Sequence, residues 1–302
     1  MQHPTQRPAQ ASGELLIGGD LKVYRLGFGA MRITGDGIWG PPDDKQEAIS
    51  VLRRTLELGI NLIDTADSYG PEVSESLIAE ALYPYPKDLV IATKGGLLRT
   101  GPGQWPPDGR PQHLREALEG SLRRLRLSHI DLYQFHRPDP KVPFEDSVGT
   151  LAQMKQEGKI RHVGLSNVTI DQLERAQKIV PIVTVQNHYN LAQRQSERMT
   201  VAESEEMIDL CARQGIGFIP WSPLTTGELA RQGGALDQIA KRHHAQPSQI
   251  ALAWLLQRSS TMLPIPGTSS VKHLEENVLG ATIKLTQEEF DSIDRSSRHV
   301  NS

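Results

Sequence analysis

The sequence predicts an α/β protein whose core is one (β/α)8 barrel, or TIM barrel, preceded by a short β-hairpin. Three observations predict this fold. Short apolar runs alternate with longer amphipathic segments, which is typical of parallel strands buried on both faces and of the helices that cover them. No change in composition divides the 302 residues. Parallel barrels commonly use about 250 residues as a single domain, so the length fits one barrel.

The N-terminal segment is expected to lie outside this domain. Residues 1–13 are rich in Pro, Gln and small polar residues and lack an apolar run, so we expect a disordered leader rather than a signal peptide. Residues 14–302 would then form the barrel domain. Glu14–Ile17 and Leu21–Tyr24 flank Gly18-Gly19-Asp20, a turn that the positive φ available to glycine favours, and they predict the hairpin.

Eight short apolar runs predict the barrel strands, and eight longer segments predict the helices. The strands are Arg25–Gly29, Asn61–Asp64, Leu89–Thr93, Ile130–Phe135, Arg161–Leu165, Val183–Gln186, Gly217–Pro220 and Met262–Ile265. The helices are Asp44–Leu58, Ser74–Leu82, Pro111–Leu125, Pro143–Gln156, Thr169–Ile179, Glu203–Gln214, Pro247–Gln257 and Val271–Gly280. A doubly wound sheet is the alternative, but the first strand is not followed by a complete G-x-G-x-x-G turn.

Side-chain chemistry also predicts where several helices begin and end. Asp43 or Asp44 is expected to cap the first helix, Ser74 the second and Thr169 the fifth, because their side chains accept hydrogen bonds from free backbone amides. Glycine tolerates the left-handed conformation that ends many helices. It is expected to end three helices at Gly59, Gly158 and Gly215.

Composition and charge exclude several classes of protein. The chain has 33 Lys+Arg against 36 Asp+Glu, a net charge of −3, so no positive field would draw it to nucleic acid or acidic membranes. One cysteine, Cys211, forms neither an intramolecular disulfide nor a Cys-rich zinc site. No run approaches the ~20 apolar residues of a membrane span. We therefore expect a cytoplasmic protein without nucleic-acid or membrane partners, and its oligomeric state is left open.

Polar residues follow three neighbouring strands at the end where barrels carry their chemistry. Asp64 and Tyr69 follow the second strand, Lys94 the third and His136 the fourth. Asp64 is placed to pair with the buried Lys94, which we expect to lower the pKa of Tyr69 by about two units and make it a general acid near neutral pH. His136 would orient a substrate oxygen. Each residue alone could be structural, Lys94 as a simple ion pair and His136 as a strand-end residue.

Taken together, these residues resemble the aldo-keto reductase family, over residues 15 to 297 approximately. The family's catalytic Asp, Tyr, Lys and His match Asp64, Tyr69, Lys94 and His136. The resemblance implies reduction of an aldehyde or ketone to an alcohol with NADPH as cofactor. In that mechanism Tyr69 protonates the substrate oxygen, Lys94 paired with Asp64 tunes Tyr69, and His136 orients the substrate. No metal is needed.

The resemblance also implies a cofactor site along the same rim. Ser166, Asn167 and Gln186 would hold the nicotinamide carboxamide, and Trp221 would stack on the nicotinamide ring. Ser166 and Asn167 could instead cap the fifth helix, and Trp221 could be an ordinary pocket aromatic. The expected cofactor residues are Gly29, Ala30, Met31, Asp64, Ser166, Asn167, Gln186, Trp221, Ser222, Pro223, Leu224, Gly227, Ile265, Pro266, Gly267, Thr268, Ser269, His273, Glu276 and Asn277.

The segment after the eighth strand is expected to hold the cofactor's far end. Free amides at a helix start, with hydroxyl groups beside them, form an anion site. The resemblance assigns this site to the adenosine 2′-phosphate and adenine. Gly267 stands where many family members have Lys, and His273 where many have Arg. The resemblance implies a preference for NADPH over NADH despite this departure.

Tryptophans in Gly/Pro-rich rim segments suggest the substrate pocket. Trp39 and Trp105 are expected to line it, which would suit a flat or apolar aldehyde or ketone, although each could simply pin its own loop. Trp254 lies in an apolar helix and is predicted to be a core residue. Residues 25–31, 81–85 and 265–270 resemble bacterial pyridoxal reductases, so pyridoxal is one candidate substrate.

Two other functions are alternatives to a reductase. Potassium-channel β subunits share the family's fold and bind NADPH while they regulate a membrane partner. We do not expect that function here, because the sequence shows no N-terminal inactivation segment and retains all the catalytic groups. A metal-dependent barrel hydrolase could use Asp64, His136 and His188. It would need a further well-placed ligand, which the sequence does not supply.

Overall fold

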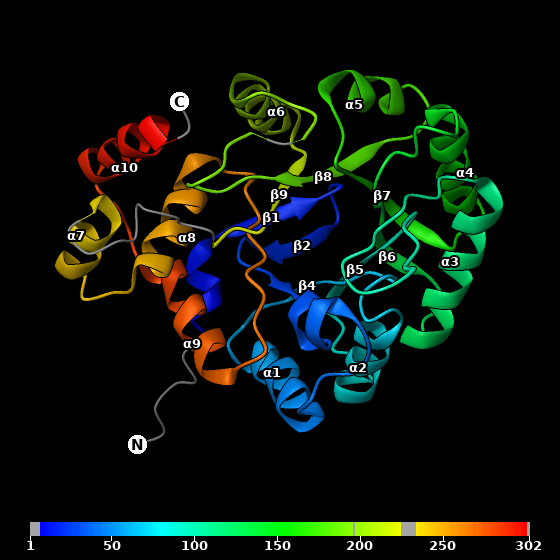
Figure 1. The fold of residues 1–302 in the computed structure, drawn as a ribbon, viewed down its shortest axis with the longest axis horizontal. Helices are drawn as coiled ribbons and strands as arrows, with labels where there is room; N and C mark the ends of the chain where they lie inside the picture. Colours follow the sequence, from blue (N-terminus) through cyan, green and yellow to red (C-terminus); the bar gives the residue numbers. More distant parts are fainter. Residues whose placement is uncertain (1–6, 196, 225–233, 301–302) are drawn as a thin grey trace.

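The structure, a computed structural model, describes residues 7–195, 197–224 and 234–300. Parallel strands form one curled sheet inside a ring of helices, as Figure 1 shows. Each strand pairs in parallel with the next strand along the chain. The strands of this sheet are β3 (Phe28–Gly29), β4 (Leu62–Asp64), β5 (Val90–Gly95), β6 (Ile130–Phe135), β7 (Ile160–Ser166), β8 (Ile182–His188) and β9 (Gly217–Trp221).

The eighth predicted strand, Met262–Ile265, lies between β9 and β3 without forming a regular strand. Leu263 N–H donates to Phe218 O at 2.8 Å on one side, and Gly27 N–H donates to Pro264 O at 3.0 Å on the other. Pro264 and the proline two residues later have no N–H, so this segment cannot complete a ladder with either neighbour. The segment nevertheless joins the two edges of the sheet, and the fold is the predicted (β/α)8 barrel.

Eight of the helices in the described residues match the predicted ones, with ends that differ by at most two residues. Two more, α7 and α10, were not predicted, and Figure 1 shows them outside the ring, beside α8. The helices are α1 (Lys45–Glu57), α2 (Val73–Leu82), α3 (Pro111–Leu125), α4 (Phe144–Gln156), α5 (Ile170–Gln177), α6 (Val201–Gln214), α7 (Ala235–Arg242), α8 (Pro247–Arg258), α9 (Val271–Leu279) and α10 (Gln287–Val300). In the described part of the chain, no helix combines the length and apolar character of a membrane span.

An aromatic stack attaches α10 to the barrel. Trp254 of α8 is fully buried, as predicted for a core residue, and lies between Phe290 of α10 at 5.7 Å and Tyr189 at 6.1 Å, measured between ring centroids. The Arg194 guanidinium lies 4.7 Å from the Trp254 ring and pairs with Asp294 of α10 at 2.8 Å. Contacts with α7, α8 and Arg194, rather than with the sheet, therefore position this last helix.

Two of the three predicted N-caps are confirmed. The Asp44 carboxylate accepts the Glu47 N–H at 2.9 Å, and Thr169 forms a capping box at the start of α5. The prediction for Ser74 is wrong, because α2 begins one residue earlier and the Ser74 hydroxyl lies 2.8 Å from that of Thr65 instead. The predicted helix-ending glycines all have positive φ: Gly59, Gly158 and Gly215.

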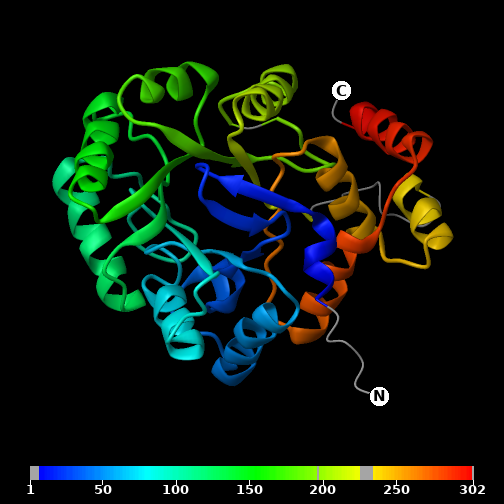
Figure 2. The same ribbon diagram turned by 180° about the vertical axis from the view of Figure 1, so that it is seen from behind.

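The predicted hairpin, β1 (Glu14–Ile17) and β2 (Leu21–Tyr24), closes one end of the barrel, as Figure 2 shows from behind. Its buried side chains, including Ile17 and Val23, pack with strand residues that point into the barrel. Asn61, at the amino end of β4, exchanges hydrogen bonds with the hairpin backbone. Because the hairpin covers the amino ends of the strands, the carboxyl ends form the open face.

Part of the expected leader is ordered. Residues 8–12 form a 3-10 helix, η1 (Pro8–Ser12), so the expectation of disorder is wrong for them. The Ala9 side chain is fully buried and its N–H donates to Leu58 O at 3.2 Å. Small side chains allow this segment to pack closely beside the end of α1, a tertiary contact that composition does not reveal.

Candidate active site

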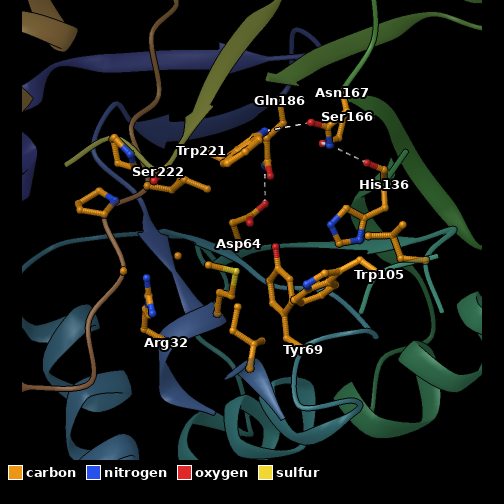
Figure 3. Close-up of a pocket in the computed structure, with 18 of the residues that line it drawn as sticks. Arg32, Asp64, Tyr69, Trp105, His136, Ser166, Asn167, Gln186, Trp221 and Ser222 are labelled. Atoms are coloured by element: carbon orange, nitrogen blue, oxygen red, sulfur yellow. Dashed lines mark hydrogen bonds between the residues drawn. The ribbon is translucent and has the colours of Figure 1, made fainter. Parts of the chain in front are cut away.

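A cavity of about 480 Å³ lies at the carboxyl ends of the strands. Its wall combines polar groups from strand ends with apolar and aromatic side chains from the loops that follow, as Figure 3 shows. The lining residues are Gly29, Met31, Arg32, Ile38, Asp64, Tyr69, Leu97, Trp105, His136, Arg137, Ser166, Asn167, Gln186, Trp221, Ser222, Pro223, Leu224, Ile265, Pro266 and Gly267.

Lys94 lies beneath the cavity, where it joins Asp64 to Tyr69. Its ammonium donates to Asp64 Oδ1 at 2.5 Å, to the Thr65 carbonyl oxygen at 2.8 Å and to the Tyr69 hydroxyl at 3.2 Å. The Lys94 and Asp64 side chains are almost fully buried. Burial opposes the charge on Lys94, but the Asp64 carboxylate and Tyr69 outweigh it and raise the pKa of Lys94. The ammonium therefore stays charged beside the tyrosine oxygen.

Two amides hold the second oxygen of Asp64. Gln134 Nε2 donates to Asp64 Oδ2 at 3.0 Å, and Gln186 Nε2 donates to the same atom at 2.9 Å. Gln186 was expected to contact the nicotinamide, and its side chain also lines the cavity. Gln134 was not singled out in the sequence, although its alternation with buried apolar residues on β6 places it inside the barrel. Together they orient the carboxylate toward Lys94.

The expected lowering of the Tyr69 pKa is wrong in sign. Burial raises the pKa of Tyr69 more than the Lys94 ammonium lowers it, so the net shift is upward from 10.0. Tyr69 is only 7% exposed, and Trp105 packs edge-on against its ring with centroids 6.3 Å apart. The hydroxyl therefore remains protonated at neutral pH, which suits a proton donor.

His136 lies beside Tyr69 with its ring nearly perpendicular, at a centroid distance of 5.8 Å. Burial lowers the pKa of His136 well below 6.5, and the neighbouring Lys94 and Arg137 charges lower it further. Its Nδ1 lies 3.4 Å from the Ser68 hydroxyl. The imidazole is therefore neutral at neutral pH and can position an oxygen by hydrogen bonding, while Tyr69 is left as the proton donor.

Across the cavity, Asn167 connects β7 to β9. Its Oδ1 accepts the Trp221 Nε1–H at 3.1 Å, and its Nδ2 donates to the His136 carbonyl oxygen at 3.1 Å, as the dashed lines in Figure 3 show. Thr169, not Ser166 or Asn167, caps α5, so helix capping does not explain these two residues. A hydroxyl, an amide and an aromatic ring are thereby held together on one wall.

Several expected cofactor residues lie outside the cavity wall: Ala30, Thr268, Ser269, His273, Glu276 and Asn277. Gly227 lies outside the described residues. The amides at the start of α9 are not all free as expected, because Ser270 N–H donates to Thr268 Oγ1 at 3.1 Å and Val271 N–H donates to Glu47 Oε1 at 2.9 Å. The protein's own acceptors occupy part of the expected anion site.

Arg32 and Arg137 line the cavity but were not predicted. Arg32 directly follows the expected cofactor residue Met31, and Arg137 directly follows the expected catalytic residue His136. This adjacency in the sequence is the signal that could have predicted them. A Cβ on Gly267 would lie 2.5 Å from the Gly29 carbonyl oxygen, so only glycine allows this close approach. The same Cβ would be 3.6 Å from Cγ of Arg32. The arginine side chain thus passes over the position that a side chain at 267 would occupy.

Arg99 joins the two rim segments that were expected to form the substrate pocket. Its guanidinium lies 3.6 Å from the Trp105 ring and 5.4 Å from the Trp39 ring, and it donates to the carbonyl oxygens of Ile38 at 2.6 Å and Ser68 at 3.0 Å. Trp105 lines the cavity, whereas Trp39 packs outside its wall. Arg99 therefore holds Trp105 against the tyrosine.

The described residues contain no group of three or more His, Cys, Asp and Glu side chains that could hold a metal ion. His188, considered above as a metal ligand, is packed beside Trp221 with ring centroids 4.2 Å apart. Burial lowers the pKa of His188. These contacts give His188 a packing role behind the tryptophan.

Comparison with known proteins identifies the class to which this barrel and site belong. The model of the Aldo/keto reductase family matches residues 25–298, so the chain belongs to this family. An uncharacterised oxidoreductase of Schizosaccharomyces pombe is 55% identical over 290 residues, which cover 96% of this chain and 92% of that protein. Pyridoxine 4-dehydrogenase of Escherichia coli is 44% identical over 287 residues, which cover 93% and 97% respectively.

Solved structures share the fold over nearly the whole length of the chain. A thermostable aldo-keto reductase in complex with the inhibitor epalrestat is 32% identical and superposes with a TM-score of 0.79, covering 94% of this chain and 98% of that one. Relatives described as an oxidoreductase and a dehydrogenase favour an enzyme over a regulatory subunit with little turnover.

Proposed function

We propose that the protein is an NADPH-dependent reductase that converts an aldehyde or ketone to an alcohol. The observation that carries the proposal is the position of the Tyr69 hydroxyl, 3.2 Å from the Lys94 ammonium and beside the neutral His136 at the wall of the cavity. Family membership supports a nicotinamide cofactor. The hydroxyl, amide and indole of Ser166, Asn167 and Trp221 suit a carboxamide on a flat aromatic ring.

Each catalytic side chain has a distinct role in this proposal. The bound nicotinamide supplies a hydride for the carbonyl carbon. The Tyr69 hydroxyl donates its proton to the carbonyl oxygen, and the Lys94 ammonium stabilises the phenolate that remains. His136 donates a hydrogen bond that orients the same oxygen. Asp64, held by the two glutamines, keeps Lys94 in place.

Loss of NADPH absorbance with a panel of aldehydes tests the proposal, comparing the intact protein with Tyr69→Phe. Removal of a positioned general acid is expected to lower kcat by about 10²- to 10⁴-fold. The dissociation constant for NADPH, measured by quenching of tryptophan fluorescence, should stay unchanged because the tyrosine hydroxyl contacts the substrate. Equal turnover by both proteins would refute the role of Tyr69.

Pyridoxal belongs in the aldehyde panel, because the Escherichia coli relative is a pyridoxine 4-dehydrogenase. Trp105 and Tyr69 offer edges and faces to a flat heteroaromatic ring. We expect pyridoxal to be reduced with a higher kcat/KM than unrelated neutral aldehydes. If pyridoxal is reduced no faster than those aldehydes, it is not the preferred substrate.

The preference for NADPH over NADH is a separate proposal. Arg32 lies beside Gly267 at the edge of the cavity, and a guanidinium there can bind a cofactor phosphate. Measured dissociation constants for NADPH and NADH test the preference directly. Equal affinity for the two cofactors would show that neither Arg32 nor the 265–277 segment discriminates the 2′-phosphate.

A further inference from the structure

The cavity wall carries an excess of positive charge. Arg32 and Arg137 both line it, and neither has a carboxylate partner in the part of the chain that the structure describes. Among the described lining residues Asp64 is the only carboxylate, and Lys94 already neutralises it at 2.5 Å. Two guanidinium charges therefore face a cavity without an acidic group of the protein to balance them.

Arg137 is half-buried, so its charge is partly removed from water. Asp139, the nearest carboxylate along the chain, is buried, and its two oxygens accept the backbone N–H groups of Gly109 at 3.1 Å and Lys141 at 2.9 Å. Asp139 therefore makes these hydrogen bonds to backbone amides, and the described residues include no ion pair between it and Arg137. A ligand in the cavity can supply the missing acceptor.

The two arginines serve different parts of the cavity. Figure 3 shows Arg32 on the opposite side from His136, which precedes Arg137 in the chain. In the proposed function the cofactor phosphates lie toward residues 265–267, on the side of Arg32. Arg137 follows His136 directly in the chain, and its charge acts on the His136 imidazole. In the proposed function this is the part of the cavity where the carbonyl oxygen of the substrate meets Tyr69. An anion near Arg137 would therefore belong to the substrate rather than to the cofactor.

We propose that Arg137 binds an anionic oxygen group of the substrate, so that the protein prefers carbonyl compounds that carry a carboxylate or a phosphate. The proposal rests on the reductase function proposed above and names its substrate class. A guanidinium offers paired N–H donors that match both groups. Trp105 and Leu97 contribute aromatic and apolar surface for the rest of the molecule.

The experiment compares an aldehyde pair that differs in charge but little in shape. We would measure kcat/KM for 4-carboxybenzaldehyde and for neutral 4-nitrobenzaldehyde, using the intact protein, Arg137→Met and Arg137→Lys. A lost charge-assisted hydrogen bond should lower kcat/KM for the carboxylate about 10- to 100-fold in Arg137→Met. The nitro compound should change less than about threefold, and Arg137→Lys should recover part of the loss.

A charge-matched control separates binding from long-range attraction. Arg123, exposed on α3, lies outside the cavity wall, so Arg123→Met removes the same charge and should leave the ratio of the two kcat/KM values unchanged. A parallel assay with 4-formylphenyl phosphate distinguishes a phosphate preference from a carboxylate preference. The NADPH dissociation constant should be the same for all variants.

Two outcomes would overturn the proposal: an intact protein whose KM is no lower for the charged aldehydes than for the neutral one, or an Arg137→Met variant that lowers kcat/KM for both aldehydes equally. Failure of every aldehyde would refute the reductase function instead. In that case calorimetric titration of benzoate and benzamide still tests Arg137. Tighter binding of benzoate, lost in Arg137→Met, would support the anion site, and equal binding of the two would refute it.

Discussion

Replacing Lys94 by Met removes the cation beside Tyr69 at little change in volume. The ammonium lies 3.2 Å from the tyrosine hydroxyl, and unit charges at that distance interact by about 5 kcal/mol at an effective dielectric constant of about 20. If about half a charge has developed on the tyrosine oxygen in the transition state, the lost stabilisation is about 2.5 kcal/mol. We therefore expect kcat for carbonyl reduction to fall about 70-fold.

The assay is single-turnover reduction of an aldehyde by the preformed complex with NADPH, which reports the chemical step rather than product release. Asp64 keeps its hydrogen bonds from Gln134 and Gln186 in the variant, so its carboxylate is not left without donors. Thermal unfolding and NADPH affinity check that the site remains folded. Lys141→Met, which removes an exposed lysine, is the matched control and should react at the original rate.

A single-turnover rate within threefold of the original in a folded Lys94→Met protein would refute this reasoning. It would mean that the ammonium does not stabilise charge on Tyr69 in the transition state. Restoration of the rate by Lys94→Arg would support the electrostatic account, because arginine keeps the charge while changing the shape.

Three further predictions follow from the same contacts. Burial raises the pKa of Tyr69 above 10.0 and lowers the pKa of His136 well below 6.5. We therefore expect kcat for reduction to be constant from about pH 6 to 9 and to fall only as the pH rises through the tyrosine pKa. A decline of kcat between pH 7 and 8 would contradict this prediction. Arg99→Ala should raise KM for aldehydes about three- to tenfold, because the guanidinium no longer contacts the Trp105 ring, and NADPH affinity should be unchanged. An unaltered KM would show that Trp39 and Trp105 keep their positions without Arg99. Trp254→Ala should lower the free energy of unfolding by about 3–5 kcal/mol in urea titrations, whereas Trp105→Ala should lower it much less. Similar urea midpoints for the two variants would contradict the proposal that the stack of Trp254 on Phe290 stabilises the fold.

The order of the strands and the grouping of Asp64, Tyr69, Lys94 and His136 could be predicted because parallel strands bring their carboxyl ends to one face. The periodicity of apolar residues is local information, and it identified the hairpin and eight helices. It also had a limit. Helices α7 and α10 interrupt the alternation of strands and helices, and their apolar faces pack on or beside α8, so the repeating pattern carried no signal for them.

The electrostatics of the site required the packed structure. The residues that bury Tyr69 come from distant segments, Trp105 among them, and their combined desolvation outweighs the nearby ammonium. The amides at the start of α9 looked free in the sequence, but Glu47, from α1, accepts one of them. Desolvation and capping by distant residues depend on three-dimensional contacts, so local sequence could predict the partners of Tyr69 but not the sign of its pKa shift.

The sequence by itself determined which fold and which reactive groups this protein has. The spacing of apolar residues identifies the strands, and the polar residues that directly follow each strand can be read from the order of residues. Only the tertiary structure decided which charges are compensated. Asp64 and Lys94 neutralise each other, Arg99 stacks between two tryptophans, and Arg137 is left facing the cavity. The balance of charge in a pocket depends on which distant side chains meet there.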